Sequence, residues 1–208
     1  LSLFEARGEL VDAAGGVLEF SDLLKRPLDA FKYLQITAET GEVQLESQNL
    51  QLNCVMVASG NELHLAAFRE HPEFASFRGR LELVRVPYLR NYLDEQRIYD
   101  AQVAPQIERH VAPHATRVAA MFAVLTRMLR PDPARYTGLL REVLGSLSAM
   151  EKMELYTTGT PPARLEIEAQ QLLRANVESL LRETDGEDDY EGASGASPRE
   201  MRGVLLDA

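Results

Sequence analysis

Three short apolar runs stand out in the first 88 residues, and each is long enough for a strand: residues 17–22, 54–58 and 81–86. The second run is continuously apolar from Cys54 to Ala58, a pattern typical of a strand that is covered on both faces. Polar residues flank the runs: Asp22 ends the first, Asn61 follows the second and Arg80 precedes the third. Ligands of open α/β sheets collect where parallel strands end, so these strands predict a site.

The residues between these runs show other patterns. The apolar stripe after Pro27 predicts a helix as far as about Thr40, ended by Gly41. Alternation in residues 43–46 and 50–52 indicates a small hairpin, and residues 62–70 predict a short helix.

Helical periodicity replaces the strand pattern after Tyr88. We expect helices over residues 92–103, 115–129, 139–155 and 163–183, and a last helix that begins near residue 198. The 115–129 helix is expected to bury Val118 and Phe122. Ser197 and Glu200 have the spacing of a capping box, and the acidic, glycine-rich residues 183–195 predict a solvated loop. The predicted fold class is therefore α/β plus all-α, with an α/β part over residues 1–88 and a helical part over residues 89–208.

Composition narrows the class of protein. The 208 residues are 45% hydrophobic and 26% charged, which indicates a globular chain with a real core. A formal net charge of −10 disfavours a general nucleic-acid surface or an anionic membrane as partner. Cys54 is the single cysteine, so an intrachain disulfide is excluded and a reducing compartment is indicated. No run approaches the length of a membrane span and no signal-peptide pattern occurs, so we expect a cytoplasmic protein.

The polar residues at the strand ends are those that nucleotide hydrolysis needs. That reaction uses an acid to orient water, a polar group near the transferred phosphate, and cations that offset the developing charge. Asp22, Asn61, Arg80 and Arg199 supply these groups. Taken singly, each is better explained by a plainer role: Asp22 as a helix-leading acid, Asn61 as a turn residue, and the two arginines as surface charges. His110 and His114 have the spacing of a zinc pair, but Pro113 between them disfavours the helix that such a pair requires.

Four segments together resemble the AAA+ ATPase module: GGVLEFSD at 15–22, ASGN at 58–61, FRGR at 77–80 and GASPREM at 195–201. In its amino-acid sequence, the chain is more closely similar to the PrkA family of bacterial serine protein kinases. The resemblance implies that residues 1–88 are the second half of an AAA+ core of the P-loop NTPase type, with parallel strands, and that residues 89–208 are its helical lid.

The resemblance also assigns roles near the first strand. Asp22 occupies the place of the catalytic Walker B acid. Ser21 stands where most AAA+ members have the Mg²⁺-linked aspartate, a departure that Glu19 could offset if the strand end is irregular.

The other roles lie further along the chain. Asn61 matches the sensor 1 residue, and Arg199 matches the sensor 2 arginine of the lid. Arg80 matches the arginine finger, which acts on the nucleotide of a neighbouring subunit; Arg78 is a second candidate for that role.

The implied cofactors are ATP and Mg²⁺, and the implied partners are a protein substrate and further copies in a homo-oligomer. No G-x-x-x-x-G-K-[ST] occurs in the sequence and the chain begins without Met, so we expect the phosphate loop upstream in a longer protein and an isolated piece that is inactive. The alternative is a scaffold derived from an AAA+ domain that does not respond to nucleotide. A DNA-binding protein is disfavoured, because no basic cluster accompanies the acidic balance.

Overall fold

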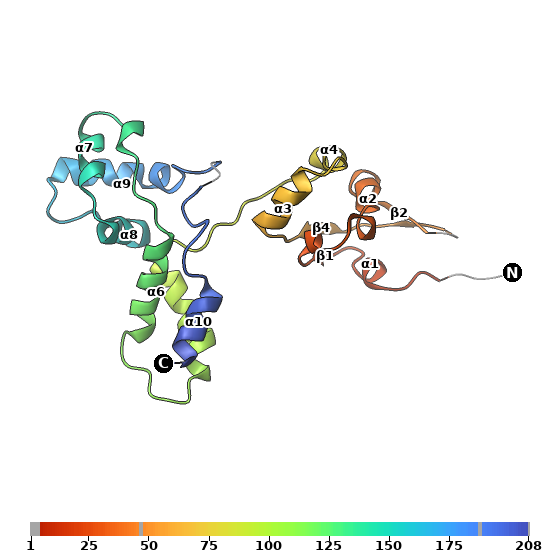
Figure 1. The fold of residues 1–208 in the computed structure, drawn as a ribbon, viewed down its shortest axis with the longest axis horizontal. Coiled ribbons are helices and arrows are strands. Elements are labelled where there is room, and N and C mark those ends of the chain that lie inside the picture. Colours follow the sequence, from red (N-terminus) through yellow and green to blue (C-terminus); the bar gives the residue numbers. More distant parts are fainter. Residues whose placement is uncertain (1–4, 46–47, 187–188, 208) are drawn as a thin grey trace. The chain divides into compact units, whose positions relative to one another are not determined.

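The computed structural model describes residues 5–45, 48–186 and 189–207. It divides into two compact units, residues 1–84 and residues 85–208. The first unit is mixed α/β and the second is helical (Figure 1). A small parallel sheet and many helices are therefore confirmed, whereas the P-loop core stays a prediction.

The first unit contains four strands and four α-helices among its described residues, joined in part by 3₁₀ turns. They are α1 (Glu9–Asp12), β1 (Val17–Phe20), η1 (Leu23–Lys25), η2 (Leu28–Ala30), α2 (Leu34–Thr40), β2 (Glu42–Gln44), β3 (Asn49–Gln51), β4 (Val55–Ala58), α3 (Glu62–Arg69) and α4 (Phe74–Arg78). The hairpin of β2 and β3 is confirmed as an antiparallel pair, although Glu46 lies outside the described residues. The helix expected over residues 28–40 is only partly correct, since η2 precedes the shorter α2. Gly41 does end it, in a left-handed conformation with φ of 72°.

β1 and β4 pair in parallel, with Val17 opposite Val55 and Phe20 opposite Ala58. One face packs on an aromatic cluster in which Phe31, Phe68 and Phe77 meet with ring centroids 5.3–5.9 Å apart. The other face is exposed: Val55 is 62% and Val57 51% accessible. The expectation of a strand buried on both faces is wrong for the described residues, because the helices of this unit cover one face alone.

The strand expected over residues 81–86 is also wrong, because this segment has no regular structure. A strand is held by hydrogen bonds to a neighbouring strand, and no described strand pairs with it. The residues before it form α4, which turns Phe77 into the aromatic cluster, and Leu81 N–H closes the helix on the Phe77 carbonyl at 3.1 Å. Val84 and Val86 remain 75% and 83% exposed.

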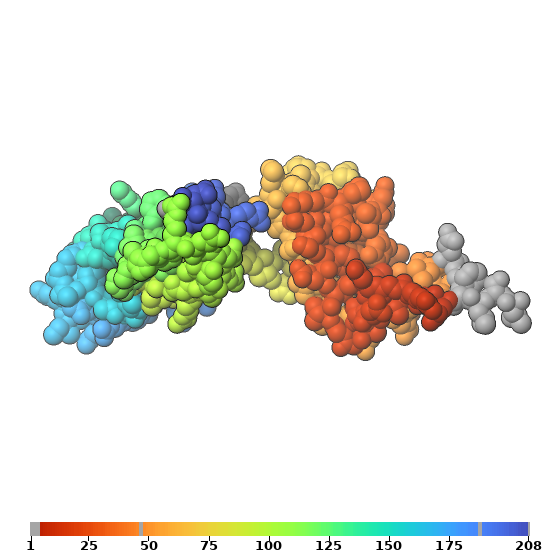
Figure 2. Space-filling model, turned by 90° about the horizontal axis from the view of Figure 1, so that it is seen from below, coloured from red at the N-terminus to blue at the C-terminus, as the bar shows by residue number. Residues whose placement is uncertain are grey.

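Helices are the regular elements of the second unit among its described residues, and irregular segments join them. Its elements are α5 (Tyr92–Ile98), the π-helical η3 (Tyr99–Val103), η4 (Ala104–Gln106), α6 (Ala115–Arg127), η5 (Pro133–Arg135), α7 (Gly138–Ser146), α8 (Ala149–Thr158), α9 (Ile167–Leu181) and α10 (Pro198–Asp207). α5, α6, α8 and α10 share one core, in which α10 contributes Met201. Both views show α10, in dark blue, lying against α6, in green (Figures 1 and 2).

Two details of this helical unit correct the sequence-based expectations. The single helix expected over residues 139–155 is two helices, because Leu147 is extended and Ser148 starts α8 with a capping box to Glu151. The face of α6 differs as well: Val118 and Phe122 are exposed, and the buried side carries Ala120, Ala123, Val124 and Arg127. Small side chains let α5 approach closely, and the buried arginine finds a carboxylate there.

Candidate functional site

The ends of β1 and β4 are joined by hydrogen bonds beyond the last strand pair. Ser59 N–H donates to the Phe20 carbonyl at 2.9 Å, and Leu23 N–H donates to the Ser59 carbonyl at 3.0 Å. The hydroxyl oxygen of Ser59 accepts the Asp22 N–H at 3.1 Å. The segment after β1 is thereby held beside the segment after β4.

Asp22 adopts a left-handed conformation with φ of 52° and ψ of 41°. Aspartate and asparagine tolerate this region better than most residues. The carboxylate is about half exposed, at 48%, and accepts a hydrogen bond from Lys25 Nζ at 2.6 Å. Asp22, to which the family resemblance assigns the Walker B role, is thus accessible at the strand end and has a cationic partner.

Asn61 begins α3, which follows β4 after a two-residue turn. Its side-chain oxygen Oδ1 accepts the His64 N–H at 2.9 Å, as an N-cap residue does. Because this bond uses the amide oxygen, the amide NH₂ group is the part of Asn61 that is left to donate to a ligand. The structure brings Asn61 and Asp22 to the same edge of the sheet.

Glu19 and Ser21 are exposed. Glu19 lies opposite Val57 on the uncovered face of the sheet, whereas Leu18 is buried on the packed face. Glu19 therefore belongs to a different side of the strand from the aromatic core.

Arg80 follows α4 and contacts α2 instead of the strand ends. Its Nη2 and Nε donate to Glu39 Oε2 at 2.6 and 2.9 Å, and Nη1 donates to the Ser76 carbonyl. Arg80 and Glu39 line a shallow hollow with Ala38 and Gly79. The structure thus gives Arg80 an intrachain partner, and Arg78 lies exposed in the last turn of the same helix.

Arg199 is exposed in the first turn of α10, in the second unit. The capping box predicted for this helix is confirmed: Glu200 Oε2 accepts the backbone N–H and the hydroxyl of Ser197, both at 2.8 Å, and Glu200 N–H donates to Ser197 Oγ at 3.2 Å. These bonds, led by the one to the Ser197 backbone, lower the pKa of Glu200. Arg199 therefore projects from a well-capped helix start.

The groups at the strand ends fit a magnesium nucleotide in their chemistry. Asp22 offers a carboxylate, Ser21 and Ser59 offer hydroxyls, and Asn61 offers amide donors. Mg²⁺ prefers oxygen ligands and is usually held by one or two carboxylates, water and substrate phosphates. In the part of the chain that the structure describes, no group of three His, Cys, Asp or Glu residues could hold a metal alone. The ion would thus depend on phosphate oxygens, with Asp22 on the protein side.

A buried ion pair that sequence reasoning missed lies in the core of the second unit. Arg127 donates to both carboxylate oxygens of Glu95 at 2.7 and 2.8 Å, and neither side chain is exposed. Tyr99 O–H donates to the same carboxylate at 2.6 Å, and burial together with this bond raises the pKa of Tyr99. The available signal was the position of Arg127, which falls on the apolar side of α6 beside Ala123 and Val124.

A second buried pair corrects the expectation of a solvated loop over residues 183–195. Glu191 is only 3% exposed and accepts Lys152 Nζ at 2.6 Å and Leu129 N–H at 2.9 Å. Tyr156 lies beside this pair, and burial raises its pKa. The described part of the acidic segment is therefore anchored to α8 and to the segment after α6, and its charge gave no sign of this.

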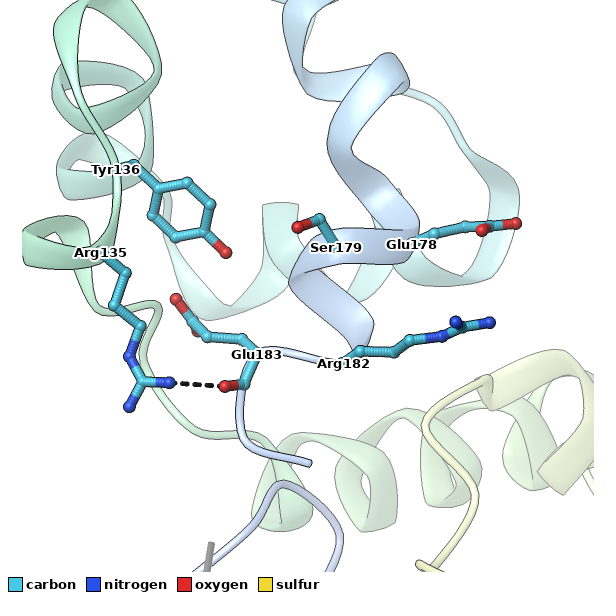
Figure 3. Close-up of a pocket in the computed structure, with 6 residues that line it drawn as sticks. All are labelled: Arg135, Tyr136, Glu178, Ser179, Arg182 and Glu183. Atoms are coloured by element: carbon cyan, nitrogen blue, oxygen red, sulfur yellow. Dashed lines mark hydrogen bonds between the residues drawn. The ribbon is translucent and has the colours of Figure 1, made fainter. Parts of the chain in front are cut away.

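A hollow of about 500 Å³ opens beside α9 (Figure 3). It is lined by Arg135, Tyr136, Glu178, Ser179, Arg182 and Glu183. Arg135 Nη1 donates to the Glu183 carbonyl at 2.6 Å, which is the dashed contact in Figure 3. The lining contains two arginines and two glutamates, so the hollow favours no ligand of one charge.

Two other expectations from the sequence concern zinc and the membrane. His114 precedes α6 in a left-handed conformation with φ of 67°, so His110 and His114 do not form the helical pair that zinc would need. Within residues 5–45, 48–186 and 189–207, none of the helices combines the length and apolar character required to span a bilayer.

The comparisons with known proteins agree on one family. A family model described as the PrkA AAA domain matches residues 2–135. The chain is 27% identical over 195 residues to the ATP-dependent protease PrkA of Bacillus subtilis strain 168, across 92% of this chain and 27% of that protein. It is 26% identical over 129 residues to the serine/threonine kinase YeaG of Escherichia coli K12, across 60% of this chain and 20% of that protein. The matched part of the chain thus spans about a quarter of the first relative and a fifth of the second. No solved structure matches it.

Proposed function

The chain belongs to the PrkA AAA domain family, and from this premise we propose that it carries the acid and sensor elements of an ATP-dependent serine protein kinase. ATP and Mg²⁺ are the proposed cofactors, and a serine-containing protein is the proposed substrate. The observation that carries this proposal is the hydrogen-bonded edge at which Asp22 and Asn61 follow two parallel strands.

In this proposal each group has a role at the nucleotide. Asp22 orients the attacking group and supports Mg²⁺ through its exposed carboxylate. The Asn61 amide donates to a phosphate oxygen, where charge grows during transfer. Bound ATP and Mg²⁺ supply the phosphoryl group and offset its charge, and Arg199 adds a cation from the lid.

Arg80 is proposed to act on the nucleotide of a neighbouring copy in a homo-oligomer. Its bond to Glu39 supports a latent state, because a guanidinium that already binds a carboxylate must leave it before it binds phosphate. This pair is surface-exposed, with Arg80 at 36% and Glu39 at 61%, and exposed pairs contribute less than about 1 kcal/mol. Release of Arg80 therefore costs little.

The test uses the full-length protein and ATP labelled at the γ-phosphate. Asp22→Asn removes the carboxylate charge and keeps a residue that tolerates left-handed geometry. We expect label transfer to protein to fall at least tenfold. This bound is conservative, because a general acid–base group usually contributes a larger factor to the rate. Asp29→Asn, at an exposed aspartate in η2, is the matched control and should retain wild-type transfer. Equal transfer by the two variants would refute the role of Asp22.

A second candidate function follows from the name of the Bacillus relative, an ATP-dependent protease that aligns with 92% of this chain. In that case the same nucleotide edge would drive peptide cleavage. Incubation of the full-length protein with a labelled casein and ATP separates the two: new fragments indicate proteolysis, and labelled intact casein indicates phosphorylation.

The nucleotide-insensitive scaffold is the alternative to both activities. Ser21, in place of the acid that most AAA+ members link to Mg²⁺, is the feature that favours it. A full-length protein that neither binds nor hydrolyses ATP, yet still binds its partners, would establish it.

A further inference from the structure

The segment that leads into α10 is bonded to the entrance of the helical unit. Tyr88 N–H donates to the Gly192 carbonyl at 2.9 Å, and Gly192 N–H donates to the Arg127 carbonyl at 3.0 Å. Gly192 has a φ of +89°, and a Cβ there would lie 2.9 Å from the Tyr88 carbonyl oxygen. The two segments of chain thus touch at a place where only glycine fits without displacement.

Ala196 is held on both sides by the end of α6. Its N–H donates to Thr126 Oγ1 at 2.8 Å, and its carbonyl accepts Arg127 Nε at 2.9 Å. A Cβ on the preceding Gly195 would lie 2.6 Å from the Thr126 carbonyl oxygen. Ala196 directly precedes Ser197, the cap of α10, so α10 begins from a fixed point.

Arg127 also binds the segment of chain that leads into α5. Arg127 Nη1 donates to the Leu89 carbonyl at 3.0 Å, while both of its terminal nitrogens bind Glu95. The guanidinium is completely buried, so it cannot exchange these partners for water. One side chain therefore joins residue 89, α5 and the start of α10.

We propose that Thr126 and Arg127 are positioning residues that fix Arg199 relative to the entrance segment, residues 85–91. This inference rests on the proposed function, in which Arg199 binds nucleotide. Through the bonds at Leu89 and Ala196, a displacement of the entrance segment is transmitted to the start of α10, three residues before Arg199. Neither Thr126 nor Arg127 touches the nucleotide in this account.

Thr126→Val is the sharpest test, because it removes the bond to Ala196, together with the local bond from the hydroxyl to the Ala123 carbonyl at 2.6 Å, and leaves the buried charges in place. Thr158→Val is the matched control: its hydroxyl bonds only within residues 154–160 at the end of α8. In the full-length protein without nucleotide, we expect Thr126→Val to speed amide exchange in residues 192–201 by about fivefold, the factor that one hydrogen bond gives. Exchange in α9 should not change, and the control should match the wild type. Unchanged exchange in residues 192–201 would overturn the proposal.

A second, kinetic measurement tests whether the bond from Thr126 to Ala196 affects the function of Arg199. We expect Thr126→Val to raise KM for ATP about fivefold with little change in kcat, and to add nothing in the Arg199→Ala background. A full additive effect in that background would overturn the role as a positioning residue. A merely destabilised protein would instead lower the active fraction and leave KM unchanged, which also contradicts the proposal.

The two arms separate this inference from the proposed function. If the wild-type protein does not bind ATP, the proposed function fails by itself. The link between the entrance segment and α10 then stands or falls on the exchange measurement, while the assignment to Arg199 is overturned.

Discussion

The buried pair of Glu95 and Arg127 gives the most quantitative prediction about the helical unit. Arg127→Met replaces the guanidinium by an apolar side chain and leaves the Glu95 carboxylate buried with Tyr99 as its remaining partner. Breaking a buried pair in this way costs about 3–5 kcal/mol. Unfolding of the α5–α6 region should become easier by that amount.

The double variant Glu95→Gln with Arg127→Met removes both charges. What is then lost is mainly the pair of bonds from Arg127 to the Leu89 and Ala196 carbonyls, at about 1 kcal/mol each. The double variant should thus be more stable than Arg127→Met alone, with a net loss of about 2 kcal/mol.

The assay is urea unfolding of the full-length protein, in which the opening of α5 and α6 is monitored by hydrogen exchange. Arg117→Met is the control: this exposed arginine of α6 donates to the Tyr92 hydroxyl at 3.1 Å, and its loss should cost about 1 kcal/mol. The reasoning is refuted if Arg127→Met costs no more than this control, or if the added Glu95→Gln recovers nothing.

Two further predictions concern local structure. Gly195→Ala should destabilise the helical unit by about 2–3 kcal/mol, because φ is +108° and the Thr126 carbonyl blocks the Cβ. Gly203→Ala inside α10 has open space around the added Cβ and should stabilise the unit by about 0.5–1 kcal/mol. Thermal unfolding compares the two variants, and equal shifts in midpoint would contradict the prediction. Arg164 lowers the pKa of Glu151 to about 2, so the stability that this carboxylate adds is present above its usual pKa near 4.5 and is lost as the pH falls toward 2. Glu151→Gln should cost about 1 kcal/mol at pH 7 and progressively less below pH 4.5 in urea titrations, and a difference that grows in acid would argue against this sign.

Local signals predicted the elements that depend on neighbouring residues. The end of α2 at Gly41 and the capping box at Ser197 both lie where the sequence indicates. The break between α7 and α8 had a comparable signal in Ser148 and Glu151, which apolar periodicity over residues 139–155 concealed.

Tertiary partners decided the rest. Residues 81–86 have the composition of a strand but no described strand pairs with them, and apolar content alone does not form one. Glu191 was expected in a solvated loop because charged residues usually lie in solvent, and no burial was predicted for Arg127. The burial of these two side chains depends on Lys152 and Glu95, far away in sequence. The proximity of Asp22 and Asn61 could be predicted, because it follows from the pairing of two parallel strands. The contact of Arg80 with Glu39 could not be predicted, because it too depends on a partner far away in sequence.

The central claim is that the edge formed by the ends of β1 and β4 faces ATP. Asn61→Asp tests it most directly, because aspartate caps a helix as well as asparagine does but replaces the amide donors with a charge that repels phosphate. The account predicts that ATP turnover by the full-length protein falls at least tenfold with unchanged thermal stability, while Asn49→Asp in β3 leaves turnover at the wild-type level. Wild-type turnover by Asn61→Asp would contradict it.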